Sequence, residues 1–220
     1  MKNIYILPEA FSGNDLLEKN TILEKISALL IGGKVGVLPA ATIYGLSCRY
    51  DDADAVRKIY AIKKRKAGMP FIVLISSISQ LGSLAGEINA TAEKLIGKYW
   101  DIKEPRPLTL VFLKNESAGS LITGGRPTIA VRMAGLRTLR DIIDRTGPIV
   151  STSATISGTA VMPRTIDEVP VEIKLKADFV VEYGSTPGGR ESTIVDITGT
   201  DPVLLREGAL DFKEILRTLE

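Results

Sequence analysis

The stretch TIAVRMAGLRTLRDIIDRTGPIVSTS, from Thr128 to Ser153, contains a strand, a helix and a second strand in direct succession. Its first six residues form the apolar run of a buried strand. Thr138 and Asp141 are spaced to cap a helix over the LRDIIDRT that follows, and Gly147 supplies its stop. After that glycine the apolar run resumes and ends in hydroxyl side chains. This pattern predicts an α/β fold.

Strands and helices continue to alternate along the rest of the 220-residue chain. Thr21 and Glu24 have capping-box spacing for a helix over 21–31, and Asp51 or Asp52 can cap another through 54–64. Apolar spacing predicts two further helices, over 91–100 and 211–219. Short apolar runs predict strands at 34–39, 42–50, 71–75, 107–114, 178–183, 192–198 and 202–207. So many short strands favour a mixed sheet, and because no linker, repeat or low-complexity segment interrupts them, we expect residues 1–220 to form a single domain.

The amino-acid composition excludes several classes of catalytic site. The chain has no histidine, which excludes Ser-His-Asp and Cys-His catalysis as well as histidine-based zinc sites. Neither a G-x-S-x-G elbow nor a Walker A phosphate-binding sequence occurs. We therefore expect no metal site, and we interpret the five hydroxyl side chains between Ser151 and Ser157 as hydrogen-bonding groups, not nucleophiles.

Cysteine content and hydropathy indicate a cytoplasmic protein. Cys48 is the only cysteine, so an internal disulfide is impossible and a buried free thiol is expected. The longest apolar stretches have the length of a strand and fall far short of the about 20 residues that a membrane helix needs. We therefore expect no membrane association and a location in the reducing cytoplasm.

Basic residues gather in one run, Lys63 to Lys66, although the net charge of the chain is only +2. One interpretation is a solvated helix end, since Lys and Arg near a carboxyl terminus complement the helix dipole. The alternative is an anion site, but Lys63 and Arg65 would diverge by about 200° on a continuing helix, so the chain would have to leave the helix there. Arg132 and Arg206 each lie at the end of a predicted strand, and several such arginines would suit a polyanion in a crevice.

Seven blocks in order along the chain resemble the signature blocks of the YrdC/TsaC family: PAATIYGL, IKKRKAGMPFIVLI, RPLTLVF, TIAVRM, VSTSATISG, ESTIVDI and LLREGAL. The resemblance implies a twisted mixed β-sheet with flanking helices around a basic cavity, in the short single-domain form of the family. It also implies a threonylcarbamoyl-AMP synthase, which makes threonylcarbamoyl-adenylate from L-threonine, bicarbonate and ATP and releases pyrophosphate. ATP would bring Mg²⁺, no cofactor would be tightly bound, and the product would pass to transfer proteins that modify an adenosine of tRNA.

The resemblance also assigns roles to individual residues of this sequence. Lys63, Arg65 and Ser153 take the positions of catalytic residues. Arg65 also takes the position of a nucleotide contact, together with Thr155 and Arg206.

Substrate-binding positions fall by the same resemblance on Thr42, Arg132 and Ser192, and Thr42 is the expected contact to threonine. The sequence departs from the family pattern near several of these positions. Thr155 replaces an asparagine, and Leu74 replaces a histidine. The pair at 40–41 is Ala-Ala, where the family has a hydroxyl and a carboxylate. These departures leave an alternative open, namely a divergent paralogue that binds nucleotide or structured RNA, such as tRNA or double-stranded RNA, without the synthase activity.

Overall fold

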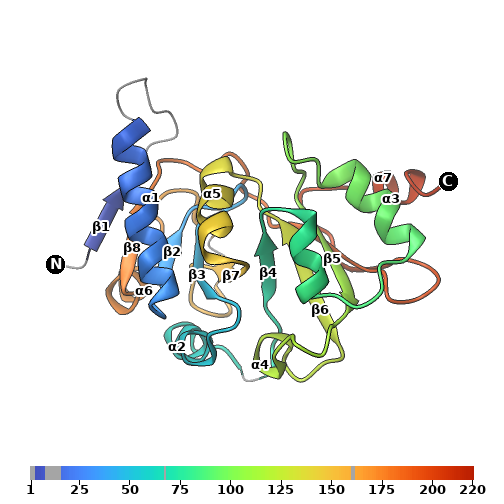
Figure 1. The fold of residues 1–220 in the computed structure, drawn as a ribbon, viewed down its shortest axis with the longest axis horizontal. Helices are drawn as coiled ribbons and strands as arrows, with labels where there is room; N and C mark the ends of the chain where they lie inside the picture. The colour runs from blue at the N-terminus through green and yellow to red at the C-terminus, as the bar shows by residue number, and fades with distance from the viewer. Residues whose placement is uncertain (1–2, 8–15, 67, 160–161) are drawn as a thin grey trace.

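The computed structural model describes residues 3–7, 16–66, 68–159 and 162–220. Within these ranges, ten strands form one sheet in the order β1-β8-β2-β3-β7-β4-β6-β5-β9-β10 (Figure 1). The strands are β1 (Asn3–Ile6), β2 (Gly36–Leu38), β3 (Gly45–Arg49), β4 (Ile72–Ile75), β5 (Leu108–Leu113), β6 (Thr128–Met133), β7 (Ile149–Ser153), β8 (Phe179–Glu182), β9 (Thr193–Asp196) and β10 (Val203–Arg206). Parallel and antiparallel neighbours both occur, which confirms the predicted mixed α/β sheet.

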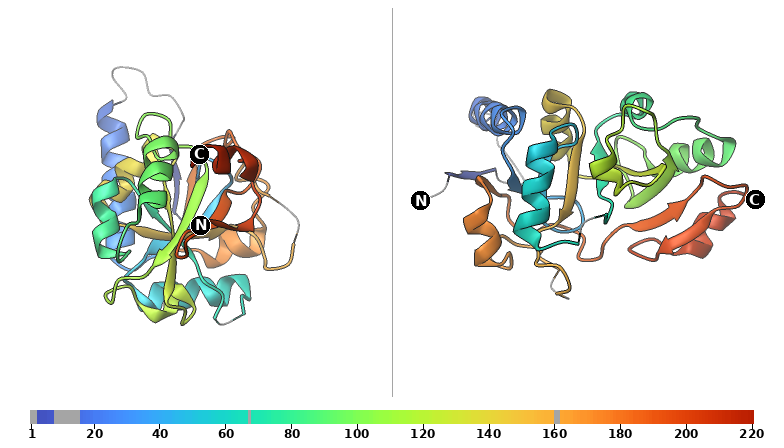
Figure 2. Two further views of the ribbon diagram at one scale, coloured as in Figure 1. Left: turned by 90° about the vertical axis from the view of Figure 1, so that its right-hand side faces the viewer. Right: turned by 90° about the horizontal axis from the view of Figure 1, so that it is seen from below.

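Helices flank both faces of this sheet (Figure 2). They are α1 (Leu16–Ile31), α2 (Ala53–Lys63), α3 (Ala90–Tyr99), α4 (Ser120–Thr123), α5 (Arg137–Thr146), α6 (Val171–Lys176) and α7 (Phe212–Arg217), with a 3₁₀ helix at Ile78–Ser83. Seen from below, α1, α5 and α3 stand on one side, whereas β9 and β10 lie toward the other (Figure 2). None of the helices in the described ranges has the length and apolar character that a membrane span requires.

The two faces of the central strands carry different kinds of side chain. Val73 of β4 lies opposite Val131 of β6 and Val150 of β7, and all three valines are fully buried in the core. Because successive residues of a strand point to opposite faces, the neighbouring pair Leu74 and Arg132 points the other way. The apolar face thus packs into the core, and the second face is free to carry polar groups.

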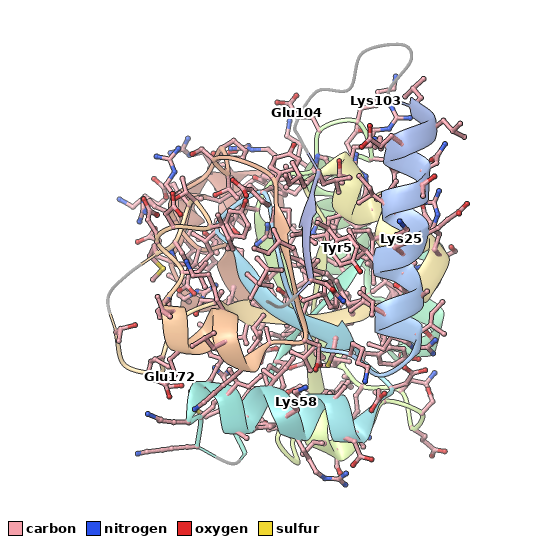
Figure 3. All side chains as sticks on the ribbon, turned by 90° about the vertical axis from the view of Figure 1, so that its left-hand side faces the viewer. Tyr5, Lys25, Lys58, Lys103, Glu104 and Glu172 are labelled. Atoms are coloured by element: carbon pink, nitrogen blue, oxygen red, sulfur yellow. The ribbon has the colours of Figure 1, made fainter. Side chains whose placement is uncertain are left out.

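The short elements near the ends of the sheet were not predicted from the sequence. Strand β1 pairs in parallel with β8, and Tyr5 packs edge-on against Phe179 with the ring centres 6.2 Å apart (Figure 3). Helices α4 and α6 and the 3₁₀ helix are also missing from the prediction. Each of these elements has at most six residues, which is too short to show a reliable apolar period.

Two of the predicted helix starts are wrong. Helix α1 begins before Thr21, whose hydroxyl lies inside the helix and donates to the carbonyl of Leu17 (3.0 Å). Helix α5 begins before Thr138, which is buried, so Thr138 and Asp141 form no cap. The capping position is Leu136, which makes no side-chain hydrogen bond there. Both threonines lie inside their helices, so the spacing that predicted a cap does not mark either helix start.

Candidate functional site

A cavity of about 190 Å³ opens on the face of the sheet that α1, α3 and α5 leave uncovered. Its wall combines cations with hydroxyl groups and apolar side chains. The cations are Arg65, Arg132 and Arg206. The hydroxyls are those of Thr42, Ser151, Thr152, Ser153 and Ser192. The apolar part includes Phe71, Ile72, Leu74 and Ile194, and the one carboxylate among the described lining residues is Glu191.

Arg132 is a buried cation with almost no internal partner. Its side chain is 6% exposed and lies between Leu74 of β4 and Thr109 of β5 in the ladder. Nη1 donates to Thr42 Oγ1 over 3.3 Å, and Nε has no hydrogen-bond partner. Burial, together with the nearby charge of Arg206, lowers the pKa of Arg132 to about 10, which leaves the group charged at neutral pH. Burying an unpaired charge is costly, so this guanidinium is prepared to receive an anion.

Arg206 stands at the end of β10 and is held firmly in place. Its Nε and Nη2 donate to the carbonyl of Ser192 (3.1 and 2.9 Å), and Nη2 also reaches Ser192 Oγ (3.3 Å). Nη1 forms an ion pair with Glu191 (2.7 Å). Ser192 Oγ is in turn 2.7 Å from Thr109 Oγ1. Thr109 of β5 lies directly opposite Arg132 of β6 in the sheet. These contacts connect the two arginines through one continuous polar wall.

Lys63 lies behind the hydroxyl part of the wall and does not line the cavity itself. The side chain is 2% exposed, and Nζ donates to the carbonyls of Ser153 and Thr155 (2.7 Å to Thr155) and toward Ser153 Oγ (3.3 Å). Burial, and to a smaller extent the charge of Arg65, lowers the pKa of Lys63 to about 8. Lys63 therefore fixes the turn that carries Ser153, and it acts on the cavity through that turn.

The basic run divides at the end of α2. The helix begins at the predicted cap Asp52, which accepts from the backbone of Ala55 (2.9 Å), and it ends at Lys64 in the left-handed conformation (φ 52°, ψ 38°). Lys64 and Lys66 are exposed, as the solvated interpretation predicts. That interpretation is wrong for Lys63, which is buried.

Arg65 is turned toward the cavity by this early helix end. Its backbone N–H returns to the carbonyl of Tyr60 (3.0 Å), and Nη2 donates to the carbonyl of Pro70 (2.8 Å). The guanidinium carbon lies 5.1 Å from the centre of the Phe71 ring, within the range of a cation–π contact. Nε has no hydrogen-bond partner, and burial lowers the pKa of Arg65. Arg65 is thus a second incompletely paired cation that lines the cavity.

Thr155 does not reach the cavity wall. Thr155 is 4% exposed, its Oγ1 lies 3.0 Å from Ser153 Oγ, and it is not among the described residues that line the cavity. The predicted direct contact between Thr155 and a nucleotide therefore lacks support in this geometry. The residue instead acts on the cavity through Ser153, whose hydroxyl it contacts.

The Sua5/YciO/YrdC family model, described as "Telomere recombination", matches residues 28–208, a range that includes every residue lining the cavity. The chain belongs to the Sua5/YciO/YrdC family. This match confirms the family resemblance that the sequence blocks predicted.

Two curated relatives from this family carry the name threonylcarbamoyl-AMP synthase. The protein of Pyrococcus abyssi is 39% identical over 188 residues, which cover 85% of this chain and 54% of the relative. The protein of Bacillus subtilis is 32% identical over 204 residues, which cover 92% of this chain and 58% of the relative. The chain therefore spans little more than half the length of these two proteins.

A solved structure of the same family shares the fold. The crystal structure of P. abyssi Sua5 complexed with L-threonine matches 98% of this chain and 60% of its own, with a TM-score of 0.89 and 34% identity. The match confirms the family's twisted mixed sheet with flanking helices. The family fold thus positions six of the predicted site residues on one cavity: Thr42, Arg65, Arg132, Ser153, Ser192 and Arg206.

Sequence reasoning missed the groups that hold this family site in shape. The carbonyl of Thr42 accepts from the backbone of Gly189 (2.8 Å) and from Thr186 Oγ1 (3.2 Å), so a distant loop fixes its orientation. Gly188 packs so closely there that a Cβ would lie 2.6 Å from Thr42 Cα. Glu191 was also missed, although it directly precedes Ser192 in the sequence. Its position beside a predicted site residue was the available signal.

Proposed function

We propose that this chain is a threonylcarbamoyl-AMP synthase, which joins L-threonine, bicarbonate and ATP and releases pyrophosphate. The observation that carries the proposal is the guanidinium of Arg132, which is buried beside Arg206 and forms no ion pair with a described residue. A buried cation in this state needs an anion, and each of the three substrates supplies one. The named relatives support the reaction, and the cavity supports the class of substrate.

The amino acid is anchored through its carboxylate. Arg132 donates to the hydroxyl of Thr42 in the cavity wall. The hydroxyl proton of Thr42 and the unused N–H groups of Arg132 can therefore donate to the same carboxylate. The ammonium group of the anchored threonine first loses one proton to solvent. The amine then condenses with bicarbonate: an N–C bond forms, the C–OH bond of bicarbonate breaks, and water leaves to give the carbamate. Leu74 and Ile194 line the same region and exclude water from the reacting groups.

The phosphates of ATP bind between Arg65, Arg206 and the hydroxyl of Ser153. A carbamate oxygen attacks the α-phosphorus, the bond from this phosphorus to its bridging oxygen breaks, and pyrophosphate leaves with the bonding electrons. Because several anions share one cavity, positioning and charge neutralisation supply most of the catalysis. No enzyme nucleophile is required, which suits a chain without histidine.

Lys63 is a positioning residue in this scheme. It holds the carbonyls of Ser153 and Thr155 and so orients the serine hydroxyl that faces the phosphates. Its charge also contributes to the positive potential behind the wall, because the amine is buried and poorly screened.

Magnesium enters this site with ATP as part of the substrate. The described residues contain no group of three or more acidic, histidine or cysteine side chains, and the cavity offers one carboxylate, Glu191. This donor set fits a cation that the nucleotide phosphates hold, since Mg²⁺ commonly binds through one or two carboxylates plus substrate phosphates. The product then passes in the cytoplasm to transfer proteins that modify tRNA.

Pyrophosphate release tests the proposal. Release from ATP should require both threonine and bicarbonate, each omitted in turn. Arg132→Gln should weaken threonine binding by about tenfold or more, the loss expected for a charged hydrogen bond. Arg126→Gln, an exposed arginine in the loop before β6, is the matched control and should behave like wild type. Binding of ATP or RNA without threonine-dependent release would support the paralogue alternative instead.

A further inference from the structure

Glu191 is an anionic side chain in a cavity built for anions. It lies beside Ser192 at the start of β9, and among the described lining residues it is the one acid facing three arginines. Its backbone is tightly held, since its carbonyl accepts from Ala209 (2.9 Å) and a Cβ on Gly208 would lie only 2.3 Å from that oxygen. The carboxylate is therefore presented from a rigid junction between β9 and β10.

The ion pair with Arg206 is not needed to position the arginine. Three further hydrogen bonds, all to Ser192, already fix Nε and Nη2 of Arg206, whereas the Glu191 carboxylate occupies Nη1. Because Ser192 engages Nε and Nη2, Nη1 is the nitrogen of Arg206 that a ligand can reach by displacing Glu191. The negative charge of Glu191 also acts on Lys63 and Arg65, whose charged forms it favours.

We propose that Glu191 is an internal counter-anion, whose carboxylate occupies the place on Arg206 that a substrate phosphate takes and so sets how tightly the cavity holds polyanions. The inference rests on the proposed function, in which phosphates bind at Arg206. An incoming phosphate must therefore displace the Glu191 carboxylate from Nη1 of Arg206 before it can bind there. The same competition speeds the departure of pyrophosphate, the most highly charged product.

Binding of inorganic pyrophosphate and of ATP, measured by titration calorimetry without metal, tests this inference directly. Glu191→Gln keeps the size and the acceptor of the side chain but removes its charge. We expect it to bind pyrophosphate about tenfold more tightly than wild type, because the competing charged hydrogen bond is weakened. Glu207→Gln is the matched control, since Glu207 is exposed, adjacent to Arg206 in sequence and changes the net charge equally. It should stay within about twofold of wild type, as exposed charges are largely screened.

A double-mutant cycle separates local competition from a general charge effect. In an Arg206→Ala background, most of the gain from Glu191→Gln should disappear, because the shared donor is gone. Unchanged pyrophosphate binding in Glu191→Gln would overturn the inference, and weaker binding would show that the carboxylate positions Arg206. Thermal unfolding of each variant verifies that it is folded. Because the assay needs no threonine, a wild type that binds pyrophosphate but lacks synthase activity would refute the proposed function alone.

Discussion

Replacing Lys63 with methionine should change the stability of the protein in a pH-dependent way. The side chain is 2% exposed, and burial lowers its pKa from the usual 10.5 to about 8. Keeping the amine charged in the folded state therefore costs about 3 kcal/mol. Methionine removes this cost but leaves the carbonyls of Ser153 and Thr155 without their donor, at about 1–3 kcal/mol each. At pH 7 the two effects oppose each other, and Lys63→Met should differ from wild type by no more than about 2–3 kcal/mol.

The balance shifts as pH rises. Between about pH 8 and 10.5, the unfolded wild type binds more protons than the folded protein, so its free energy of unfolding increases with pH. Lys63→Met lacks this amine, so its free energy of unfolding does not increase for this reason. The stability advantage of wild type over Lys63→Met should therefore grow by about 2–3 kcal/mol from pH 7 to pH 10.

Urea unfolding of both proteins at pH 7, 8.5 and 10 measures this difference, and other titrating groups cancel in the comparison. Lys66→Met is the control, since Lys66 is exposed in the same basic run. A difference between wild type and Lys63→Met that stays constant across this pH range would refute the reasoning, because it would mean that the buried amine has an ordinary pKa.

Three further predictions concern one residue of the cavity wall and two residues that support it. Arg206→Ala should weaken ATP binding by about 1.5–3 kcal/mol while Lys66→Ala changes it by less than about 0.5 kcal/mol, and equal losses would indicate a diffuse polyanion surface. Thr155→Val removes the 3.0 Å bond to Ser153 and should cost about 1 kcal/mol of stability, with a smaller loss of ATP affinity than Arg206→Ala in the same titration. Gly188→Ala, which crowds the backbone of Thr42, should lower stability by about 1–3 kcal/mol and raise the KM for threonine. Its control, Gly97→Ala in α3, meets no atom within 4 Å and should stabilise the protein by up to about 1 kcal/mol.

The sequence alone determined the elements whose signal is local. The apolar runs before and after α5 are strands β6 and β7, and Gly147 ends the helix between them, as predicted. Apolar periodicity and glycine stops depend on neighbouring residues, so they can be identified without the fold. The helix starts near Thr21 and Thr138 were misplaced, because the capping-box spacing occurs inside both helices and does not mark where either begins. The resemblance to the family assigned a role to six of the residues that line the cavity, and composition and spacing alone could not have brought these six together.

The tertiary structure decided which charges belong to the site. Lys63 and Lys64 are adjacent and chemically identical, yet Lys63 is buried against the turn after β7, whereas Lys64 is exposed and pairs with Glu172 of α6. Likewise, Glu191 and Arg206 meet only because β9 and β10 are antiparallel neighbours. The physical reason is that burial and charge pairing depend on segments distant in sequence, and these segments are brought together only when the sheet has formed.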